Sequence, residues 1–315
     1  MTATRRLGST DLKIAPLVLG GNVFGWTADK AESFAVLDAF VAAGGTMIDT
    51  ADVYSAWAPG HQGGESETVI GEWLRASGKR DAVLIATKVG MLPVAGEKLA
   101  PANIAAACDA SLRRLGTDRI DLYYAHQDDE SVPQDDVLAA FGKLIDAGKV
   151  RVIGASNFTA ARLKSAVDLS RDGTLPRYHV LQPEYNLVSR KAYEGELQAF
   201  CAAENVAALP YYGLAAGFLT GKYRSAADLA KSVRSRSAKD QLEGNGPAVL
   251  AAMDEIAAET GAPLAAIALA WLTAQAGVCA PIASARTVDQ LPDLIASLTL
   301  ELGEDQLARL TNAGA

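Results

Sequence analysis

The segment IDTADVYS, residues 48–55, joins the end of an apolar run to a cluster of polar side chains. The run itself, TMIDTA at positions 46–51, is short and apolar, as is typical of a buried strand. Asp49, Asp52 and Tyr54 then follow at its end. Buried carboxylates are stable only when they are paired or hydrogen-bonded. We therefore expect this strand to end in a site that holds something.

Seven further apolar runs of the same character occur along the chain. Most of the eight lack the alternation of polar and apolar residues that marks a half-exposed strand, so they are typical of parallel strands covered on both faces. In chain order the other seven are LVLGG (17–21), VLIATK (83–88), IDLYYA (120–125), VRVIGAS (150–156), HVLQPE (179–184), VAALPY (206–211) and VCAPIA (278–283).

Amphipathic helix patterns separate these runs. Phe34, Leu37 and Val41 have helical spacing before a Gly44–Gly45 stop, and similar stripes occur at 137–145 and 264–275. Successive runs begin about 27 to 37 residues apart, except for a last interval of about 72. Eight such units predict an α/β fold, a (β/α)₈ TIM barrel, with residues 1–315 as a single domain.

Two segments lie outside this repeat. The N-terminal RRLGSTDLKIAP, residues 5–16, has a turn-like centre between two short runs and predicts a β-hairpin that caps the barrel floor. The polar, basic segment at 221–246 falls in the long last interval. It predicts a long loop before the last strand and not a linker between domains.

Composition excludes several classes of partner and site. A net charge of −8 argues against a nucleic-acid or anionic-membrane partner, because both require a basic face. The three cysteines are widely spaced with no CxxC, so we expect neither a disulfide framework nor a thiolate zinc site. The histidines have no i, i+4 pairing, and we expect no metal. No signal peptide or spanning segment is evident, which favours the cytoplasm.

Polar groups follow five successive predicted strands. Asp49 ends the second strand and Lys88 the third, and His126 follows the fourth. Ser156 and Asn157 come after the fifth, and Gln182 ends the sixth. In a barrel of this kind the carboxyl ends of the strands meet at one rim, where reacting groups are found. The spacing therefore predicts one functional rim.

In this rim and in a series of motifs the chain resembles the aldo-keto reductase family. The resemblance implies the barrel already inferred and the reduction of aldehydes and ketones, which are small-molecule substrates, with a nicotinamide cofactor. It also implies a catalytic tetrad of Asp49, Tyr54, Lys88 and His126. The matching blocks, in order, are RRLGSTDLKIAPLVLGG, IDTADVY, GGESETVIGEWL, LIATKVG, SLRRLGTDRIDLYYAHQDD, LIDAGKVRVIGASNF, LQPEYNL, GLAAGFLTGKY and PIASARTVDQL.

The chemistry of carbonyl reduction suits these four residues. Hydride transfer leaves an alkoxide that needs a proton, and a phenol such as Tyr54 can donate one. We expect the Lys88 ammonium to lower the pKa of Tyr54 and Asp49 to hold Lys88 in place. We expect His126 to be neutral and to orient the substrate oxygen.

The resemblance also implies a set of cofactor-binding residues. Ser156, Asn157 and Gln182 would bind the carboxamide of the nicotinamide, whose ring would stack on Tyr211. The run 213–222 would follow the pyrophosphate. Arg286 could form a forked pair with a 2′-phosphate, which favours NADP(H) over NAD(H). The full set is Gly21, Ser156, Asn157, Gln182, Tyr211, Gly213, Leu214, Gly217, Leu219, Gly221, Lys222, Ser284, Arg286 and Gln290.

The chain departs from the family pattern at three places. Ile282-Ala283-Ser284 replaces the usual Ile-Pro-Gly, and residues 211–214 read Tyr-Tyr-Gly-Leu instead of Tyr-Ser-Pro-Leu. Leu294 stands where an asparagine is often found. These departures leave the adenine contacts and the cofactor preference open, but they do not affect the tetrad.

Several alternatives remain at this point. Trp26 and Trp57 lie in loops after the first two strands, where they could line a substrate site or serve as packing. The same two possibilities hold for Phe24 and Met91. Asp52 has no such family role, and we expect it to cap a turn or helix. Lys88 could instead be a Schiff-base lysine, as in barrel aldolases. A non-catalytic regulatory or binding subunit on the same fold is the alternative from another class. The oligomeric state is left open.

Overall fold

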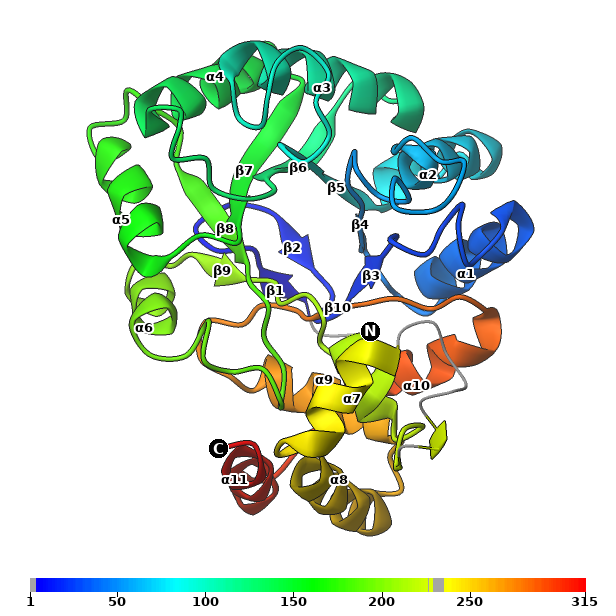
Figure 1. Cartoon of the computed structure of the whole chain (residues 1–315). Helices are drawn as coiled ribbons and strands as arrows, with labels where there is room; N and C mark the ends of the chain where they lie inside the picture. Colours follow the sequence, from blue (N-terminus) through cyan, green and yellow to red (C-terminus); the bar gives the residue numbers. More distant parts are fainter. Residues whose placement is uncertain (1–3, 226, 229–234) are drawn as a thin grey trace.

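Eight parallel strands form the closed sheet at the centre of the structure, a computed structural model that describes residues 4–225, 227–228 and 235–315 (Figure 1). The ladder ends at β10 and β9, and a parallel bridge between Ala208 and Val278 joins these two ends. Around the sheet the strands are β10 (Ile282–Ala283), β3 (Val18–Gly20), β4 (Met47–Asp49), β5 (Leu84–Val89), β6 (Ile120–Ala125), β7 (Val150–Ser156), β8 (Tyr178–Gln182) and β9 (Ala207–Ala208).

The eight predicted strands are confirmed in number, order and direction. Each begins within the apolar run that predicted it, or one residue before that run, and nearly every strand residue is buried, as expected for strands covered on both faces. The parallel register aligns Gly20 with Asp49, and Ser156 with Gln182. The polar strand ends therefore lie side by side along one rim.

Six helices surround the sheet between strands β3 and β9, and five more follow β9 (Figure 1). The patterns at 34–41, 137–145 and 264–275 correspond to helices α1, α4 and α9. The helices are α1 (Lys30–Ala42), α2 (Glu65–Ser77), α3 (Pro101–Leu115), α4 (Gln134–Asp146), α5 (Ala160–Leu169), α6 (Glu196–Ala203), α7 (Ser235–Glu243), α8 (Gly246–Thr260), α9 (Leu264–Thr273), α10 (Leu291–Ile295) and α11 (Glu304–Ala313).

Local sequence accounts for where individual helices begin. Helix α1 starts at a capping box in which Asp29 accepts from the backbone N–H of Glu32, and Glu32 accepts from that of Asp29. Helix α3 starts with Pro101 in its first turn, where the missing N–H is not needed. Helix α9 is buried from Ala265 to Leu272, which explains its nearly uniform apolar composition.

The predicted N-terminal hairpin is present. Strands β1 (Arg5–Arg6) and β2 (Lys13–Ile14) pair antiparallel. Leu7, Leu12 and Ile14 pack into the apolar cluster that fills the barrel interior. A Cβ on Gly8 would lie 2.5 Å from the His179 carbonyl oxygen, at the amino end of β8. The hairpin therefore closes the barrel at the end opposite the polar rim.

The prediction of a long loop at 221–246 is wrong in part. Helix α7 occupies Ser235–Glu243, and helix α8 begins at Gly246. Residues 226 and 229–234 of this segment lie outside the described residues. The helix was missed because its apolar contact is small, consisting of Ala238 and Leu242 one turn apart. The rest of this stretch is polar, so it has no apolar stripe of the length that identified α1 and α4.

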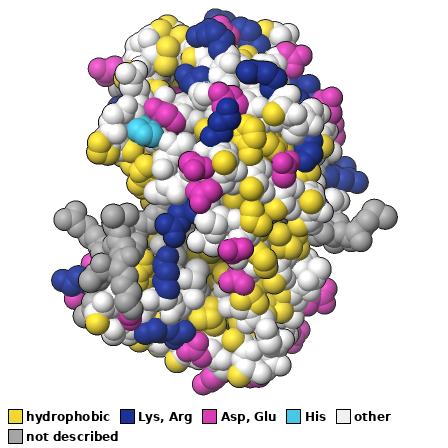
Figure 2. Space-filling model, turned by 90° about the vertical axis from the view of Figure 1, so that its right-hand side faces the viewer, with side chains coloured by type: hydrophobic (Ala, Val, Ile, Leu, Met, Phe, Trp, Pro, Cys, Tyr) yellow, Lys and Arg dark blue, Asp and Glu magenta, His cyan; other side chains and the backbone are white. Residues whose placement is uncertain are grey.

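No single helix among the described residues is long and apolar enough to cross a bilayer, although α8 and α9 taken together meet the length and composition test across a 99° bend. The side of the molecule that carries α1, α2 and α10 shows a band of hydrophobic side chains among acidic and basic ones (Figure 2). Both signs of charge are interspersed there, so this face presents no continuous basic surface.

A buried polar network links strand β5 to helices α2 and α3. Glu67 is fully buried and accepts hydrogen bonds from Thr87 Oγ1 and Arg114 Nε, both at 2.6 Å. Asp52 is fully buried beside this network, yet neither of its carboxyl oxygens has a hydrogen-bond partner among the described residues. Burial and the nearby Glu67 raise the pKa of Asp52 to about 8.

The prediction that Asp52 caps a turn is therefore wrong. The turn after β4 is closed by the backbone instead, because the Tyr54 N–H donates to the Ala51 carbonyl at 3.2 Å. The sequence pattern was misleading because a short carboxylate after a strand usually faces solvent or a free amide. Here the loop folds inward and leaves the Asp52 carboxyl protonated at neutral pH.

We predict that Asp52→Asn removes a pH-dependent loss of stability. The folded pKa of about 8 lies above the unfolded value of about 3.9. The contribution of Asp52 to the free energy of unfolding is therefore fully present below the unfolded pKa. That contribution declines as pH rises toward 8. Urea denaturation at pH 6 and pH 9 measures the free energy of unfolding of both proteins. The difference, variant minus wild type, should be larger at pH 9 than at pH 6 by a few kcal/mol, as an order of magnitude. The exposed Asp118→Asn serves as the control, and equal pH dependence in wild type and Asp52→Asn would contradict the account.

Candidate active site

Lys88 is the centre of a buried cluster at the carboxyl rim. Its side chain is fully buried, and its Nζ donates to Asp49 Oδ2 at 2.7 Å, to the Thr50 carbonyl at 2.8 Å and to Tyr54 Oη at 2.8 Å. An ammonium group has three N–H donors, and all three are used. Burial lowers the pKa of Lys88, and the Asp49 carboxylate opposes this shift. The structure thus brings three of the four predicted tetrad residues into direct contact.

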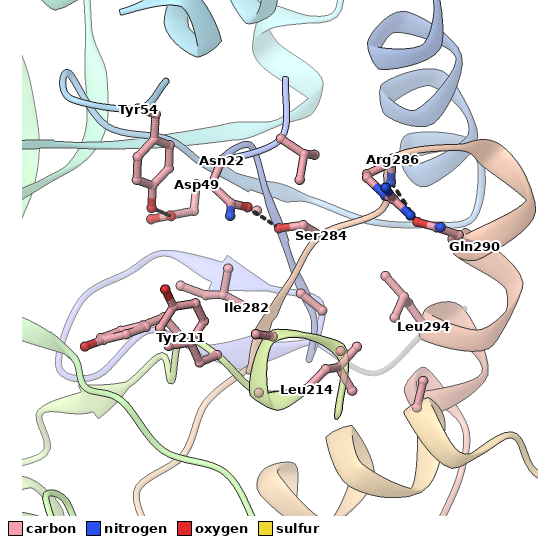
Figure 3. A pocket seen from close by; sticks show the side chains of 18 of the residues that line it. Asn22, Asp49, Tyr54, Tyr211, Leu214, Ile282, Ser284, Arg286, Gln290 and Leu294 are labelled. Atoms are coloured by element: carbon pink, nitrogen blue, oxygen red, sulfur yellow. Dashed lines mark hydrogen bonds between the residues drawn. The ribbon is translucent and has the colours of Figure 1, made fainter. Parts of the chain in front are cut away.

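The Tyr54 hydroxyl accepts one hydrogen bond and donates another. It accepts from Lys88 and donates to Asp49 Oδ2 at 3.3 Å (Figure 3). Burial, and then the negative charge of Asp49, raise the pKa of Tyr54 well above its ordinary value. The prediction that Lys88 produces a lowered pKa is therefore wrong. The surrounding protein and the Asp49 charge disfavour the phenolate, although the side chain is only half-buried at the cavity wall, so Tyr54 is a protonated phenol at neutral pH.

His126 lies beside this phenol. Its ring makes an edge contact with the Tyr54 ring at 6.2 Å between centroids, and its Nδ1 has no hydrogen-bond partner among the described residues. Burial, together with the charge of Lys88, lowers the pKa of His126 well below its ordinary value. The expectation of a neutral imidazole is confirmed. The ring is therefore able to donate or accept a hydrogen bond without adding a second charge.

A chain of amide and hydroxyl groups extends from Asp49 across the rim. Gln182 Nε2 donates to Asp49 Oδ1 at 2.9 Å, so both carboxylate oxygens of Asp49 are occupied. Ser156 Oγ donates to the Gln182 carbonyl at 2.9 Å, and Asn157 Nδ2 donates to the His126 carbonyl at 3.0 Å. The Tyr211 hydroxyl donates to Asn157 Oδ1 at 2.8 Å. Gln182 therefore orients the tetrad directly, a contact that its sequence position did not reveal.

A cavity of about 1160 Å³ opens above the tetrad. Asp49, Tyr54 and His126 line it, whereas Lys88 does not and lies beneath them. Of the four residues considered for the mouth, Trp26, Trp57 and Met91 are in the lining, whereas Phe24 is buried in the core. The predicted cofactor residues in the lining are Ser156, Asn157, Gln182, Tyr211, Gly213, Leu214, Gly217, Lys222, Ser284, Arg286 and Gln290.

Three predicted cofactor residues lie outside the lining. The Gly21 N–H donates to the Asp49 carbonyl at 2.7 Å, and a Cβ at Gly21 would lie 2.9 Å from Ser66 Oγ, so Gly21 permits close packing under the rim. Leu219 is fully buried in the core. Gly221 ends the short helix at Ala215–Thr220 with a φ of 78°. These three residues shape the backbone and the packing behind the cavity and do not form its wall.

The segment after β9 follows one wall of the cavity. Its backbone bends through positive φ at Tyr212, Ala215, Ala216 and Gly217, with values between 47° and 92°. Successive residues in this region turn the chain sharply, so Gly213, Leu214 and Gly217 all reach the lining. That the run 213–222 follows a pyrophosphate stays a prediction.

The residues of this wall fit a phosphate-bearing dinucleotide. Lys222 and Arg286 both line the cavity, and neither forms a salt bridge with a residue in the described part of the chain. Two such cations can each bind a phosphate. Arg286 lies away from Tyr54, and its backbone N–H donates to Gln290 Oε1 at 2.9 Å (Figure 3). The Ser156 hydroxyl and the side-chain amides of Asn157 and Gln182 lie near the tetrad, at the other end of the cavity.

Some lining residues were missed. Asn22 faces the cavity immediately after β3, with its Oδ1 2.5 Å from Ser284 Oγ (Figure 3). The rule that polar groups follow strands at the rim would have identified it. Asp289 and Asp293 line the cavity beside Arg286, and Leu294 fills the position where the family pattern has asparagine. No strand end points to these helical residues, so strand spacing could not have predicted them.

Comparison with known proteins agrees with this geometry. The family model described as "Aldo/keto reductase family" matches residues 16–315. "Protein tas" of Escherichia coli strain K12 is 34% identical, over 97% of this chain and 95% of that protein. "Norsolorinic acid reductase stcV" of Emericella nidulans is 32% identical, over 94% and 77%. "Uncharacterized oxidoreductase YrpG" of Bacillus subtilis strain 168 is 32% identical, over 97% and 94%. The chain therefore belongs to the aldo/keto reductase family.

Proposed function

We propose that this protein reduces an aldehyde or ketone to an alcohol with NADPH, using Tyr54 as the proton donor. Family membership supports carbonyl reduction in general. The observation that carries the specific assignment is the convergence of Lys88 on Asp49 and Tyr54 at the wall of a large cavity. A buried cation held by a carboxylate beside a protonated phenol is suited to proton donation.

The residues of the chain divide the work between binding and proton transfer. NADPH, when bound, supplies the hydride to the carbonyl carbon. Ser156, Asn157 and Gln182 would bind its carboxamide beside Tyr211, while Lys222 and Arg286 would bind phosphate groups. His126 lies beside Tyr54 and would hydrogen-bond the carbonyl oxygen, thereby orienting it toward the phenol.

Proton transfer then follows from the contacts of Tyr54. As charge develops on the carbonyl oxygen, the Tyr54 O–H turns from Asp49 to this oxygen and its proton moves across. An alkoxide is a stronger base than a phenolate, so the transfer is downhill despite the raised pKa of Tyr54. The Lys88 ammonium, 2.8 Å from Tyr54 Oη, stabilises the phenolate that remains. Both the hydride and the proton are thus accounted for.

The aldolase alternative has little support in this geometry. A Schiff-base lysine must reach the substrate carbonyl with a free amine. Lys88 is fully buried, uses all three N–H groups and lies outside the cavity lining. A non-catalytic role would leave NADPH unoxidised with every carbonyl offered, so turnover also distinguishes that alternative.

We predict that Tyr54→Phe lowers kcat by about 10²- to 10⁴-fold, because it removes the proton donor and leaves the ring in place. NADPH affinity should be unchanged. The measurement is NADPH oxidation by wild type and variant across aldehydes, ketones, quinones and sugars, with a fluorescence titration for cofactor binding. Tyr123→Phe is the control for loss of a tyrosine hydroxyl, because Tyr123 is buried outside the cavity lining and its hydroxyl has no partner among the described residues. Turnover by Tyr54→Phe at the wild-type rate would contradict the mechanism.

We also predict that Arg286→Ala weakens NADPH binding by roughly 10- to 100-fold, the amount expected for a lost hydrogen bond between charged groups. NADH, which lacks the 2′-phosphate, should bind the variant and the wild type equally. Titration of both cofactors measures this, with the exposed α2 residue in Arg75→Ala as the control. An equal loss for NADPH and NADH would show that Arg286 does not read the 2′-phosphate.

A further inference from the structure

Large apolar side chains are unusually exposed at one end of the cavity. Trp57, Met91 and Tyr212 are 50%, 41% and 54% exposed, and all three line the cavity that contains Tyr54. Six described residues are exposed large hydrophobics, so half of them gather at this one site. Exposed apolar groups that cluster at a concave site mark a place where another molecule is bound.

Trp57 is held in a defined orientation beside the proton donor. Its ring contacts the Trp26 ring edge-on, at 5.5 Å between centroids and 82° between planes. It also contacts the Tyr54 ring at 6.0 Å and 63°. These separations are within the range of favourable aromatic contacts. One face of a preformed aromatic wall is therefore adjacent to the atom that would protonate the substrate.

Tyr212 supplies a second ring from a strained position. Its φ is 55°, a region that side chains of its size rarely adopt. Its carbonyl accepts from Asn186 Nδ2 at 3.0 Å and from the Ala215 N–H at 2.7 Å, which holds the backbone in this conformation. Its ring makes an edge contact with Tyr211 at 5.1 Å. Strain that the surroundings enforce is concentrated at functional sites.

Tyr212 is also a departure of this chain from the family pattern. The resemblance places a serine at this position, in Tyr-Ser-Pro-Leu, where residues 211–214 here read Tyr-Tyr-Gly-Leu. The shared chemistry of the family does not require a large aromatic ring here. Its presence in the cavity wall therefore points to a property of this enzyme in particular.

The charges around the cavity restrict what this wall can bind. Among the residues that the structure describes, the lysine and arginine side chains in the lining are Lys222, whose Nζ would lie 2.7 Å from a Cβ on Gly217, and Arg286, which lies away from Tyr54 (Figure 3). Near the tetrad, Lys88 is buried and fully paired, and His126 is neutral. An anionic substrate would therefore find no free counter-charge beside Trp57 among the described lining residues, whereas an uncharged planar ring would have favourable contacts.

We propose that Trp57 and Tyr212, supported by Trp26 and Met91, form a subsite for uncharged, planar aromatic aldehydes and ketones. The aromatic ring packs against Trp57 and Tyr212, and the carbonyl oxygen points toward Tyr54 and His126. This inference rests on the proposed carbonyl reduction, because it assigns the substrate class of the same cavity. Tyr212 acts on specificity and takes no part in proton transfer.

The first test compares 2-naphthaldehyde with butanal as substrates. Tyr212→Ser should raise the KM for 2-naphthaldehyde by about 3- to 10-fold, the effect of one aromatic contact, and change that for butanal by less than about two-fold. Tyr212→Phe keeps the ring and should retain the wild-type preference. Leu169→Ser removes an exposed apolar side chain outside the cavity and should change neither KM. Equal effects of Tyr212→Ser on both aldehydes would overturn the proposal.

The second test separates the subsite from the reaction. 2-Naphthamide, which cannot be reduced by hydride transfer of this kind, is titrated calorimetrically into the NADP⁺-saturated protein. Weaker binding by Tyr212→Ser than by Tyr212→Phe supports the subsite even if no carbonyl is ever reduced, an outcome that would overturn only the proposed function. Equal binding by both variants, or a parallel loss of NADP⁺ affinity in Tyr212→Ser, overturns the subsite and leaves carbonyl reduction intact.

Discussion

The Lys88 ammonium, buried under the carboxyl rim of the barrel, is the constraint on which the rest of the site depends. Removing an ammonium from water costs several kcal/mol, and a single counter-ion seldom compensates for it. Here Asp49, the Thr50 carbonyl and Tyr54 Oη occupy all three N–H groups. Tyr54 is thus placed by the requirement to satisfy a buried cation. Its hydroxyl has one geometry in which the ammonium is fully bonded, and in that geometry it faces the cavity.

The barrel makes this arrangement possible through strand register. Asp49, Lys88 and Gln182 come from β4, β5 and β8, and parallel pairing brings their strand ends to one rim. Gln182 then bonds the second oxygen of Asp49, and Ser156 bonds the Gln182 carbonyl. The groups proposed to bind the nicotinamide are therefore connected through hydrogen bonds to those proposed to protonate the substrate. Asp49 and Gln182 form the direct link between the two sets.

Much of the fold followed from sequence because its signals are local or periodic. Eight short apolar runs at regular spacing specify parallel strands, and polar residues at their ends specify a rim. Helix α7 was missed because the apolar contacts of its described side chains are limited to Ala238 and Leu242. The state of Asp52 and the raised pKa of Tyr54 could not be predicted either. Both depend on how the folded chain surrounds one carboxyl and one phenol and on which charges it places beside them, which no spacing along the sequence encodes.

The aromatic wall is a second feature that could not be predicted from the order of residues along the chain. Trp57 and Tyr212 are distant in sequence and follow different strands, β4 and β9. Trp57 was predicted as a mouth residue, but Tyr212 appeared only as a departure from a motif. Its importance became visible when its exposure, its positive φ and its place in the cavity were known together. Pairings of this kind require the closed barrel.

The most direct test of the central claim is a double-mutant cycle between Lys88→Met and Tyr54→Phe, with kcat/KM for carbonyl reduction as the readout. If Lys88 acts through Tyr54, Lys88→Met should lower kcat/KM by about 10²-fold in the wild-type background and by less than about three-fold once Tyr54 is phenylalanine. Circular dichroism would confirm that each variant is folded. An equal loss in both backgrounds would contradict the account, because Lys88 would then contribute to catalysis independently of the phenol.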